Sequence, residues 1–319
     1  MADNMMRTAG RDIHGQAKGL TVENDPNGRG VLRVVDAAPF AYNVDQNTLR
    51  TENSALLNAV NNIGFTGLDA NEMPLAKAIL GLDTFDFNFF FPLQEANSKV
   101  ANDLSGKGYL GQKYGVLTDN TDGTKASRRM GLFGSDVSPI SFIRVPSVAG
   151  TRGLDKFTFF ATVEIKDDGM QGTIYNESSA TDHATVRFQV TKNADRTITL
   201  NLRPNDSTLY SVTTNDPIDI GFHMLFVTVN LVDKRFSIYL NGGSALPVTQ
   251  SGQLPSATTM PNTNSYVINV GMSGTTLNRI PENPSPSQFK GSISNIGLVS
   301  PNLGLGEMKI LTSEAGFRI

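Results

Sequence analysis

The sequence predicts a mainly β protein whose antiparallel strands form two packed sheets. Apolar residues occupy every second position over 225–231 and again over 236–240, with a short polar turn between the two runs. Because successive side chains of a strand point to opposite faces, this segment is typical of a half-buried antiparallel hairpin. The same alternation recurs over residues 157–165, 186–190 and 198–202. Many short strands separated by Gly, Asn and Asp turns indicate a sandwich.

The composition is that of a folded, soluble protein and disfavours several partners. The chain has 319 residues, of which 39% are hydrophobic, enough to fill the core of one large sandwich and a smaller module. Its net charge of -3 leaves no basic surplus to neutralise phosphates, so we expect no nucleic-acid partner. The longest apolar run, residues 87–93, is too short to span a bilayer, so we expect no membrane partner. The chain contains no Cys, which excludes disulfides and thiolate metal sites.

The chain divides into three zones. Residues 1–48 are polar and Gly-rich, with one short β-like piece at 30–35, which predicts an extended arm that packs on something else. Residues 49–83 carry two helical patterns and form either a linker or an oligomerisation collar. The strand patterns fill residues 84–319, which we assign to the sandwich.

Each helical pattern has its own start and stop signals. The first places apolar residues at helical spacing over 56–63 and ends at Gly64. The second begins with Asn71 as a cap, has Pro74 in its first turn and ends at Gly81. The apolar stripe of the first is narrow, so a coiled coil and simple docking against the sandwich are both open. We expect the protein to be a homo-oligomer.

Ordered segments of the third zone resemble one known family. Residues 87–93 resemble its first strand, Asp103-Leu-Ser-Gly106 resembles its Asp-x-Ser-Gly turn, and Tyr239-Leu-Asn-Gly242 matches its Tyr-x-Asn-Gly turn. Other segments follow in the same order: 131–134 with 142–146 as paired strands before the central sheet, 157–164 and 221–229 as later strands, then 267–271, 289–296 and 306–308 as closing strands and a terminal turn. The zone thus resembles the laminin-G-like, or concanavalin-A-like, lectins, although Phe222 stands where the family usually has Trp. The resemblance implies a lectin-like jelly-roll sandwich.

The resemblance also implies two kinds of binding residue. Members of the family often hold calcium at the loop rim, so Asp103 and Asp182 are conceivable ligands; the alternative is that each caps the backbone of a turn. Sugars commonly stack on an exposed aromatic ring, and the chain has no Trp. The glycan-binding candidates are therefore Tyr109, Tyr175 and Tyr210, with packing at the sandwich edge as the alternative.

No constellation of residues predicts catalysis or a metal centre. The three histidines, His14, His183 and His223, have no metal-ligand spacing. Glucan-cleaving enzymes with this sandwich need two carboxylates on one strand, and the Glu-x-Asp-x-x-Glu pattern is absent. The nearest acidic group, Glu164 with Asp167 and Asp168, straddles a strand end and a turn and is interpreted as surface polarity. Residues 119–123 superficially resemble a calcium loop, but the twelfth position would be Arg129, so a turn is the better interpretation.

The arm carries a second resemblance. Residues 7–18, 20–22 and 30–35 resemble the amino-terminal segments of structural proteins from tailed phages of Gram-positive bacteria. No secretory signal is visible at the start of the chain, although lectin-like sandwiches usually work outside cells. A virion component assembles in the host cytoplasm and leaves by lysis, which makes the missing signal expected.

Together these patterns predict a phage virion structural protein, in a fibre, baseplate or decoration, that displays a lectin-like sandwich on the particle surface. Residues 1–83 would contact other virion proteins, and the sandwich would bind host cell-surface polysaccharide. Repeated weak sites suffice on a particle, because effective concentration multiplies avidity. The alternatives are a decoration protein of capsid or tail without a ligand, and a glycan hydrolase, which the missing acidic motif disfavours.

Overall fold

The computed structural model describes two units of the chain, Met1–Phe65 and Thr66–Ile319. The described residues are 6–7, 20–24, 30–34, 85–93, 99–119, 130–136, 138, 140–179, 185–204, 209–262, 266–273 and 287–317. In the first unit, β1 (Met6–Arg7), β2 (Leu20–Asn24) and β3 (Gly30–Val34) form an antiparallel sheet in that order. The predicted strand at 30–35 is thus β3, whereas both predicted helices of residues 49–83 lie outside the described residues.

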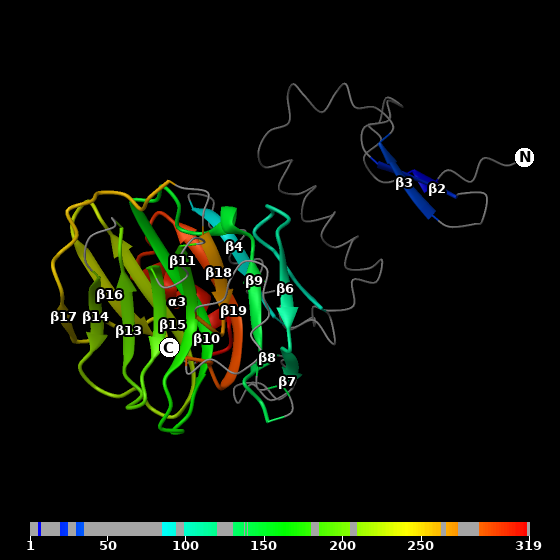
Figure 1. The fold of residues 1–319 in the computed structure, drawn as a ribbon. Helices are drawn as coiled ribbons and strands as arrows, with labels where there is room; N and C mark the ends of the chain where they lie inside the picture. Colours follow the sequence, from blue (N-terminus) through cyan, green and yellow to red (C-terminus); the bar gives the residue numbers. More distant parts are fainter. Residues whose placement is uncertain are drawn as a thin grey trace, which may run out of the picture. The chain divides into compact units, whose positions relative to one another are not determined.

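The second unit contains a seven-stranded antiparallel sheet (Figure 1). Its strands are β4 (Asp86–Phe91), β7 (Leu117–Asp119), β8 (Met130–Phe133), β10 (Lys156–Ile165), β15 (Gly221–Asn230), β16 (Arg235–Leu240) and β19 (Gly291–Ser300). The order is β16-β15-β10-β19-β8-β7. The strands β8 and β4 pair with the same edge of β19. The first residues of β19 pair with β8, and its last residues pair with β4.

A nine-stranded antiparallel sheet packs against the first one. Its strands are β5 (Val100–Asn102), β6 (Leu110–Tyr114), β9 (Phe142–Val145), β11 (Gly172–Ser179), β12 (Val186–Lys192), β13 (Ile198–Leu202), β14 (Tyr210–Thr214), β17 (Val248–Ser251) and β18 (Tyr266–Val270). The order is β17-β14-β13-β12-β11-β18-β9-β6-β5, and a short 3-10 helix, η2 (Ser147–Ala149), follows β9. The predicted sandwich is confirmed.

Aromatic side chains from both sheets meet in the main core. The ring centroids of Phe159 on β10 and Tyr175 on β11 are 5.0 Å apart, and those of Phe157 and Phe188 are 5.2 Å apart in an edge-to-face arrangement. Such pairs bury large apolar surfaces and prefer this range of distances. The alternation of β10 therefore places one face of that strand against the nine-stranded sheet, as the sequence predicts.

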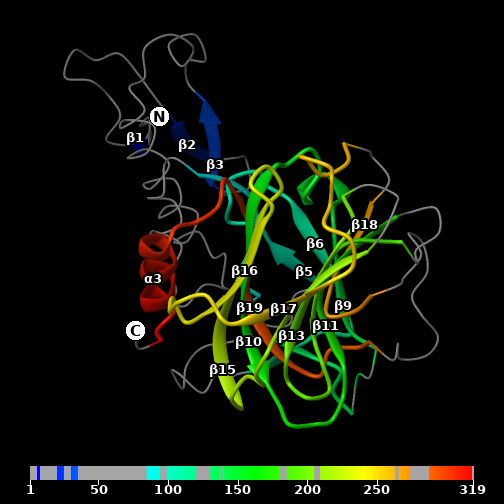
Figure 2. The same ribbon diagram turned by 90° about the vertical axis from the view of Figure 1, so that its left-hand side faces the viewer.

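The predicted hairpin is β15 and β16, but both of its faces are covered. Leu225, Val227 and Val229 point into the main core, as expected. Phe226, on the other face, belongs to a second core beneath the helix α3 (Leu305–Glu314). Figure 2 shows the resulting layers, with α3 beside the seven-stranded sheet and the nine-stranded sheet on the far side.

Two expectations from the family resemblance are wrong. Residues 306–308, expected to form a terminal turn, are the start of α3, because an apolar sheet face is available for the helix to cover. Residues 131–134 and 142–146, expected to be paired strands, belong to different sheets. The strand β8 pairs with β7 and β19, whereas β9 pairs with β18 and β6.

Candidate functional site

The outward side of the nine-stranded sheet carries a row of uncharged polar side chains. In β12 and β13, Phe188, Val190, Leu200 and Leu202 face the main core, so the residues between them point outward. The strand register then places one outward residue of each strand opposite the next. The row consists of Asn176 on β11, Gln189 on β12, Asn201 on β13, Ser211 on β14 and Ser251 on β17, and we call it the amide row.

Hydrogen bonds run along the amide row in one direction. Ser211 Oγ donates to Asn201 Oδ1 at 2.7 Å, and Asn201 Nδ2 donates to Gln189 Oε1 at 3.0 Å. Gln189 Nε2 donates to Asn176 Oδ1 at 3.3 Å. An amide has two N–H donors and two acceptor lone pairs, so Asn201 and Gln189 each keep a donor and a lone pair for another molecule. The chain of bonds also fixes the orientation of each amide before anything binds.

A row of threonines lies beside the amide row. It consists of Thr191, Thr199, Thr213 and Thr249, which are likewise opposite one another on β12, β13, β14 and β17. The hydroxyls of Thr199 and Thr213 are 2.9 Å apart, and Thr249 Oγ1 donates to Asn215 Oδ1 at 2.8 Å. We call the two rows together the polar face.

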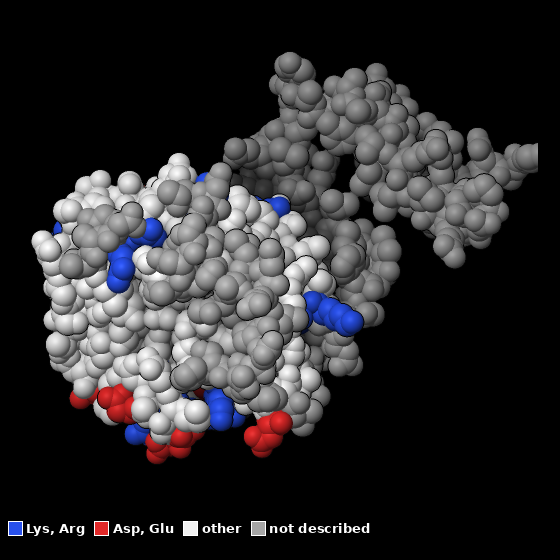
Figure 3. Space-filling view, in the orientation of Figure 1, with Lys and Arg blue, Asp and Glu red and all other residues white. Residues whose placement is uncertain are grey.

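The two rows of the polar face contain no ionisable side chain. The same register continues from Asn176 to Asn269 and then to Arg144, whose Nε donates to Asn269 Oδ1 at 2.8 Å. Gln189, Asn201 and Ser211 are half-buried and Ser251 is exposed, whereas Asn176 and Thr191 are buried. In Figure 3 the middle of this side of the molecule is white where residues are described, basic side chains lie above it, and acidic residues gather along the lower edge of the molecule. Strand separation places neighbouring side chains of a row about 4.8 Å apart. Such a strip of fixed donors and acceptors suits an uncharged, hydroxyl-rich chain.

Two of the three tyrosine candidates are wrong. Tyr175 is fully buried in the main core, where its hydroxyl donates to Glu177 Oε1 at 2.7 Å. Tyr210 is 2% exposed and packs its ring 5.0 Å from that of Phe236. Both rings occupy core-facing positions of a strand, so a sugar cannot reach them. Tyr109 is partly buried and packs against the main core, which is the alternative that the sequence left open.

Asp103 caps backbone in the way expected of an aspartate at a turn. Its Oδ1 accepts hydrogen bonds from the backbone N–H groups of Phe90 and Ser105 at 2.8 and 2.9 Å. Its Oδ2 accepts from Ser105 Oγ at 2.6 Å and from Tyr109 N at 3.3 Å. The other conceivable calcium ligand, Asp182, lies outside the described residues. Within the described part of the chain, no three His, Asp or Glu side chains are grouped closely enough to hold a metal ion.

Glu164, at the end of β10, and Asp168, just after it, form ion pairs with lysines. Glu164 Oε2 lies 3.0 Å from Lys166 Nζ and accepts a hydrogen bond from Ser292 N at 3.1 Å. Asp168 pairs with the buried ammonium of Lys192. Burial alone would raise the pKa of Asp168, but its hydrogen bonds to Lys192 and to the N–H of Met170 lower the pKa below its ordinary value.

Of the three histidines, the structure describes His223 alone. His223 lies on β15, as the resemblance implies. His14, His183 and residues 120–129, which include most of the loop that superficially resembles a calcium site, lie outside the described residues. Among the helices that the structure describes, none is both long and apolar enough to cross a membrane.

The amide row was missed because it depends on register. The alternating segments 186–190 and 198–202 place Gln189 and Asn201 on the outward face of their strands. Whether two such residues meet depends on which residue of one strand faces which residue of the next. A shift of one position would turn the amides towards the core. The register is set by the lengths of the turns, and the alternation within a single strand does not reveal it.

Comparisons with known proteins add support for the fold. No family model and no curated protein matches the chain. Among solved structures, it is similar to one of botulinum neurotoxin type C, which depends on interaction with two ganglioside molecules to enter cells. That match has 14% identity, covers 73% of this chain and 52% of the other, and has a TM-score of 0.51.

A second similar structure is the binding domain of Paraclostridial Mosquitocidal Protein 1. The match has 14% identity, covers 72% of this chain and 52% of the other, and has a TM-score of 0.50. The chain thus spans about half the length of these neighbours. At this identity the likeness shows the fold alone. The fold of residues 85–317 is therefore an antiparallel β-sandwich of two packed sheets.

Proposed function

We propose that the sandwich is a glycan-binding module that holds an uncharged stretch of polysaccharide along its polar face. The amide row is the observation that carries this proposal. Each sugar hydroxyl both donates and accepts hydrogen bonds, and the row offers both kinds of partner in a fixed order. The ganglioside dependence of botulinum neurotoxin type C is a property of a protein with this fold, and it agrees with a glycan-binding role here.

We propose further that the protein is a structural component of a tailed-phage virion. The phage-like segments of residues 7–35 support this origin, and the separate unit Met1–Phe65 is suited to attachment. Residues 1–83 bind other virion proteins, and copies of the sandwich face outward from a fibre, baseplate or decoration. Many copies on one particle turn weak single contacts into firm adhesion.

The binding proposal is tested with the full chain and purified host cell-wall polysaccharide. Asn201→Ala removes the central amide of the row, and the affinity should fall about three- to tenfold, because one neutral hydrogen bond contributes about 0.5–1.5 kcal/mol. Gln250→Ala is the matched control, since Gln250 is an exposed amide of β17 that does not belong to the polar face. Equal loss in both variants, or no loss in Asn201→Ala, would contradict the proposal.

A further inference from the structure

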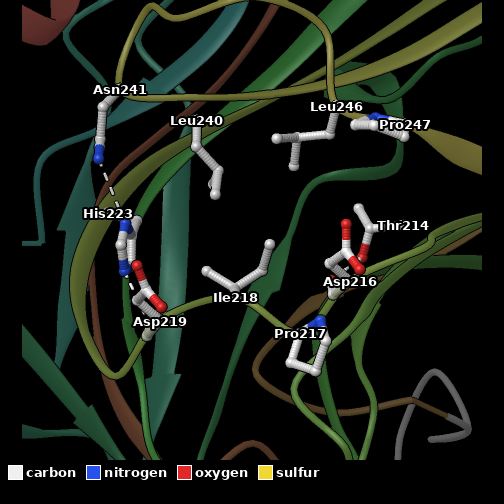
Figure 4. Close-up of a pocket in the computed structure, with 10 residues that line it drawn as sticks. All are labelled: Thr214, Asp216, Pro217, Ile218, Asp219, His223, Leu240, Asn241, Leu246 and Pro247. Carbon is white, nitrogen blue, oxygen red and sulfur yellow. Dashed lines mark hydrogen bonds between the residues drawn. The ribbon is translucent and has the colours of Figure 1, made fainter.

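A pocket of about 270 Å³ lies where β14 and β16 end, and none of its lining residues belongs to the polar face (Figure 4). It is formed by the segment that joins β14 to β15, by the first residues of β15 and by the segment that joins β16 to β17. Ile218, Leu240 and Leu246 provide apolar walls. Backbone hydrogen bonds hold these walls in place, with Ile218 N donating to Arg196 O at 3.1 Å and Leu246 N donating to Ile238 O at 2.8 Å.

The charge of the pocket is negative. Asp216 and Asp219 are exposed and line it, and no Lys or Arg is among its described lining residues. Arg196, whose carbonyl anchors the wall, has its guanidinium 3.9 Å from Asp167 instead. An anionic group would therefore meet two carboxylates without a compensating cation in this lining, which costs free energy.

The imidazole of His223 adds no positive charge. Its Nε2 lies 2.9 Å from the carbonyl oxygen of Asp219 and its Nδ1 lies 3.2 Å from Asn241 Nδ2. A neutral ring satisfies both contacts, because Nε2–H donates to the carbonyl and Nδ1 accepts from the amide. Met224 N donates to Asn241 Oδ1 at 2.8 Å, which fixes the amide in that orientation. Burial lowers the pKa of His223 in agreement with this geometry.

We propose that this pocket binds a primary ammonium group on a small carbon skeleton, of the kind that amino sugars and amino-acid esters of cell-wall polymers carry. The carboxylates of Asp216 and Asp219 attract the ammonium, and the apolar walls contact the carbons beside it. A calcium ion takes about six to eight oxygen ligands, and the described lining offers too few carboxylates to supply them. The site adds a contact for charged substituents that the uncharged polar face lacks.

The test measures binding of small probes to the full chain by titration with NMR detection. Glucosamine, ethanolamine and D-alanine methyl ester carry the ammonium, and N-acetylglucosamine is the matched probe without the charge. At least one amine should bind about tenfold more tightly than N-acetylglucosamine, and Asp219→Asn and Asp216→Asn should each weaken it by about three- to tenfold. Asp233→Asn, an exposed aspartate in the β15–β16 turn, should leave the affinity unchanged.

The pattern among the amines identifies the source of the ligand. Preference for glucosamine assigns an amino sugar, and preference for D-alanine methyl ester assigns an amino-acid ester. Equal affinity for N-acetylglucosamine and glucosamine, or no binding of any amine, would overturn the proposal. Since Asn201→Ala changes only the polar face, amine binding should persist in that variant even if the polysaccharide proposal fails.

Discussion

Glu177 is a carboxyl group enclosed in the core of the sandwich. It is fully buried, and its contacts among the described residues are uncharged groups of Thr151 and Tyr175. Burial disfavours the ionised form and raises the pKa from 4.5 to about 7, although the hydrogen bonds from Thr151 and Tyr175 act in the opposite direction. The native protein therefore takes up a proton near neutral pH at this residue.

This residue makes stability depend on pH. Because the pKa is higher in the folded than in the unfolded chain, the contribution of the group is fully present below pH 4.5 and is lost as the pH rises through about 7. The pKa difference corresponds to roughly 3 kcal/mol in the free energy of unfolding. Urea unfolding at about pH 5.5 and about pH 8 should show higher stability at the lower pH. Glu177→Gln should remove most of the difference in free energy of unfolding between the two pH values. If the variant keeps the full difference, other titratable groups cause it.

The carboxylates at the end of β10 are engaged in ion pairs, so we expect binding without turnover. Glu164 contacts Lys166, and Asp168 contacts Lys192, so each carboxylate already has a cationic partner. Host cell-wall polysaccharide incubated with the protein should release no reducing ends. Release that disappears in Glu164→Gln or Asp168→Asn would instead establish a hydrolase.

The helix α3 is the element that closes the second core. Met308 and Leu311 are buried against Phe160 and Phe226 of the seven-stranded sheet, whereas Ile310 on the outer side is 49% exposed. The sheet would otherwise present these large apolar rings to water. The helix is thus an integral part of the sandwich.

Paired substitutions on α3 test this role. Leu311→Ala should lower the free energy of unfolding by about 2–5 kcal/mol, because it removes buried methyl groups and leaves a cavity. Ile310→Ala is the control and should change stability by no more than about 0.5 kcal/mol. Denaturant titrations of the two variants give the comparison, and similar losses in both would mean that α3 does not pack as described.

The strands with alternating apolar residues could be predicted from the sequence, whereas the helix α3 and the strands β11, β14 and β17 were not predicted. Strict alternation over residues 157–165 and 225–231 is a local signal, and the strands formed where it occurs. In α3, Gly306 and the scattered apolar positions give no clear stripe, and the helix forms because a sheet face distant in sequence needs a cover. The amide row also depends on such long-range pairing, as does the pocket, whose walls come from separate segments.

At the scale of the whole molecule, we expect the arm and the sandwich to have separate roles. We predict that a fragment of residues 84–319 folds alone, because its strands supply both sheets and the core between them. A soluble full chain beside a molten fragment 84–319 in circular dichroism and ANS binding would show that residues 49–83 belong to the sandwich core.

The arm should serve attachment. Its strands β1, β2 and β3 form a small sheet, but the few apolar residues of the arm cannot offset the entropy of ordering all of its roughly forty residues, so limited proteolysis of the free protein should cut within residues 1–48. Deletion of residues 1–48 should prevent incorporation into virions, as measured by immunoblotting of purified particles, and leave the sandwich folded. Normal incorporation of the deleted form would rule out the attachment role.

The central claim is that polysaccharide lies along the polar face, and a structure of the full chain with an oligosaccharide from the host cell wall tests it most directly. The account predicts a sugar chain across β12, β13, β14 and β17, with hydroxyls within hydrogen-bond distance of Gln189, Asn201 and Ser211. Sugar bound at the Asp103 turn, or on another face while the amide row stays bare, would contradict it.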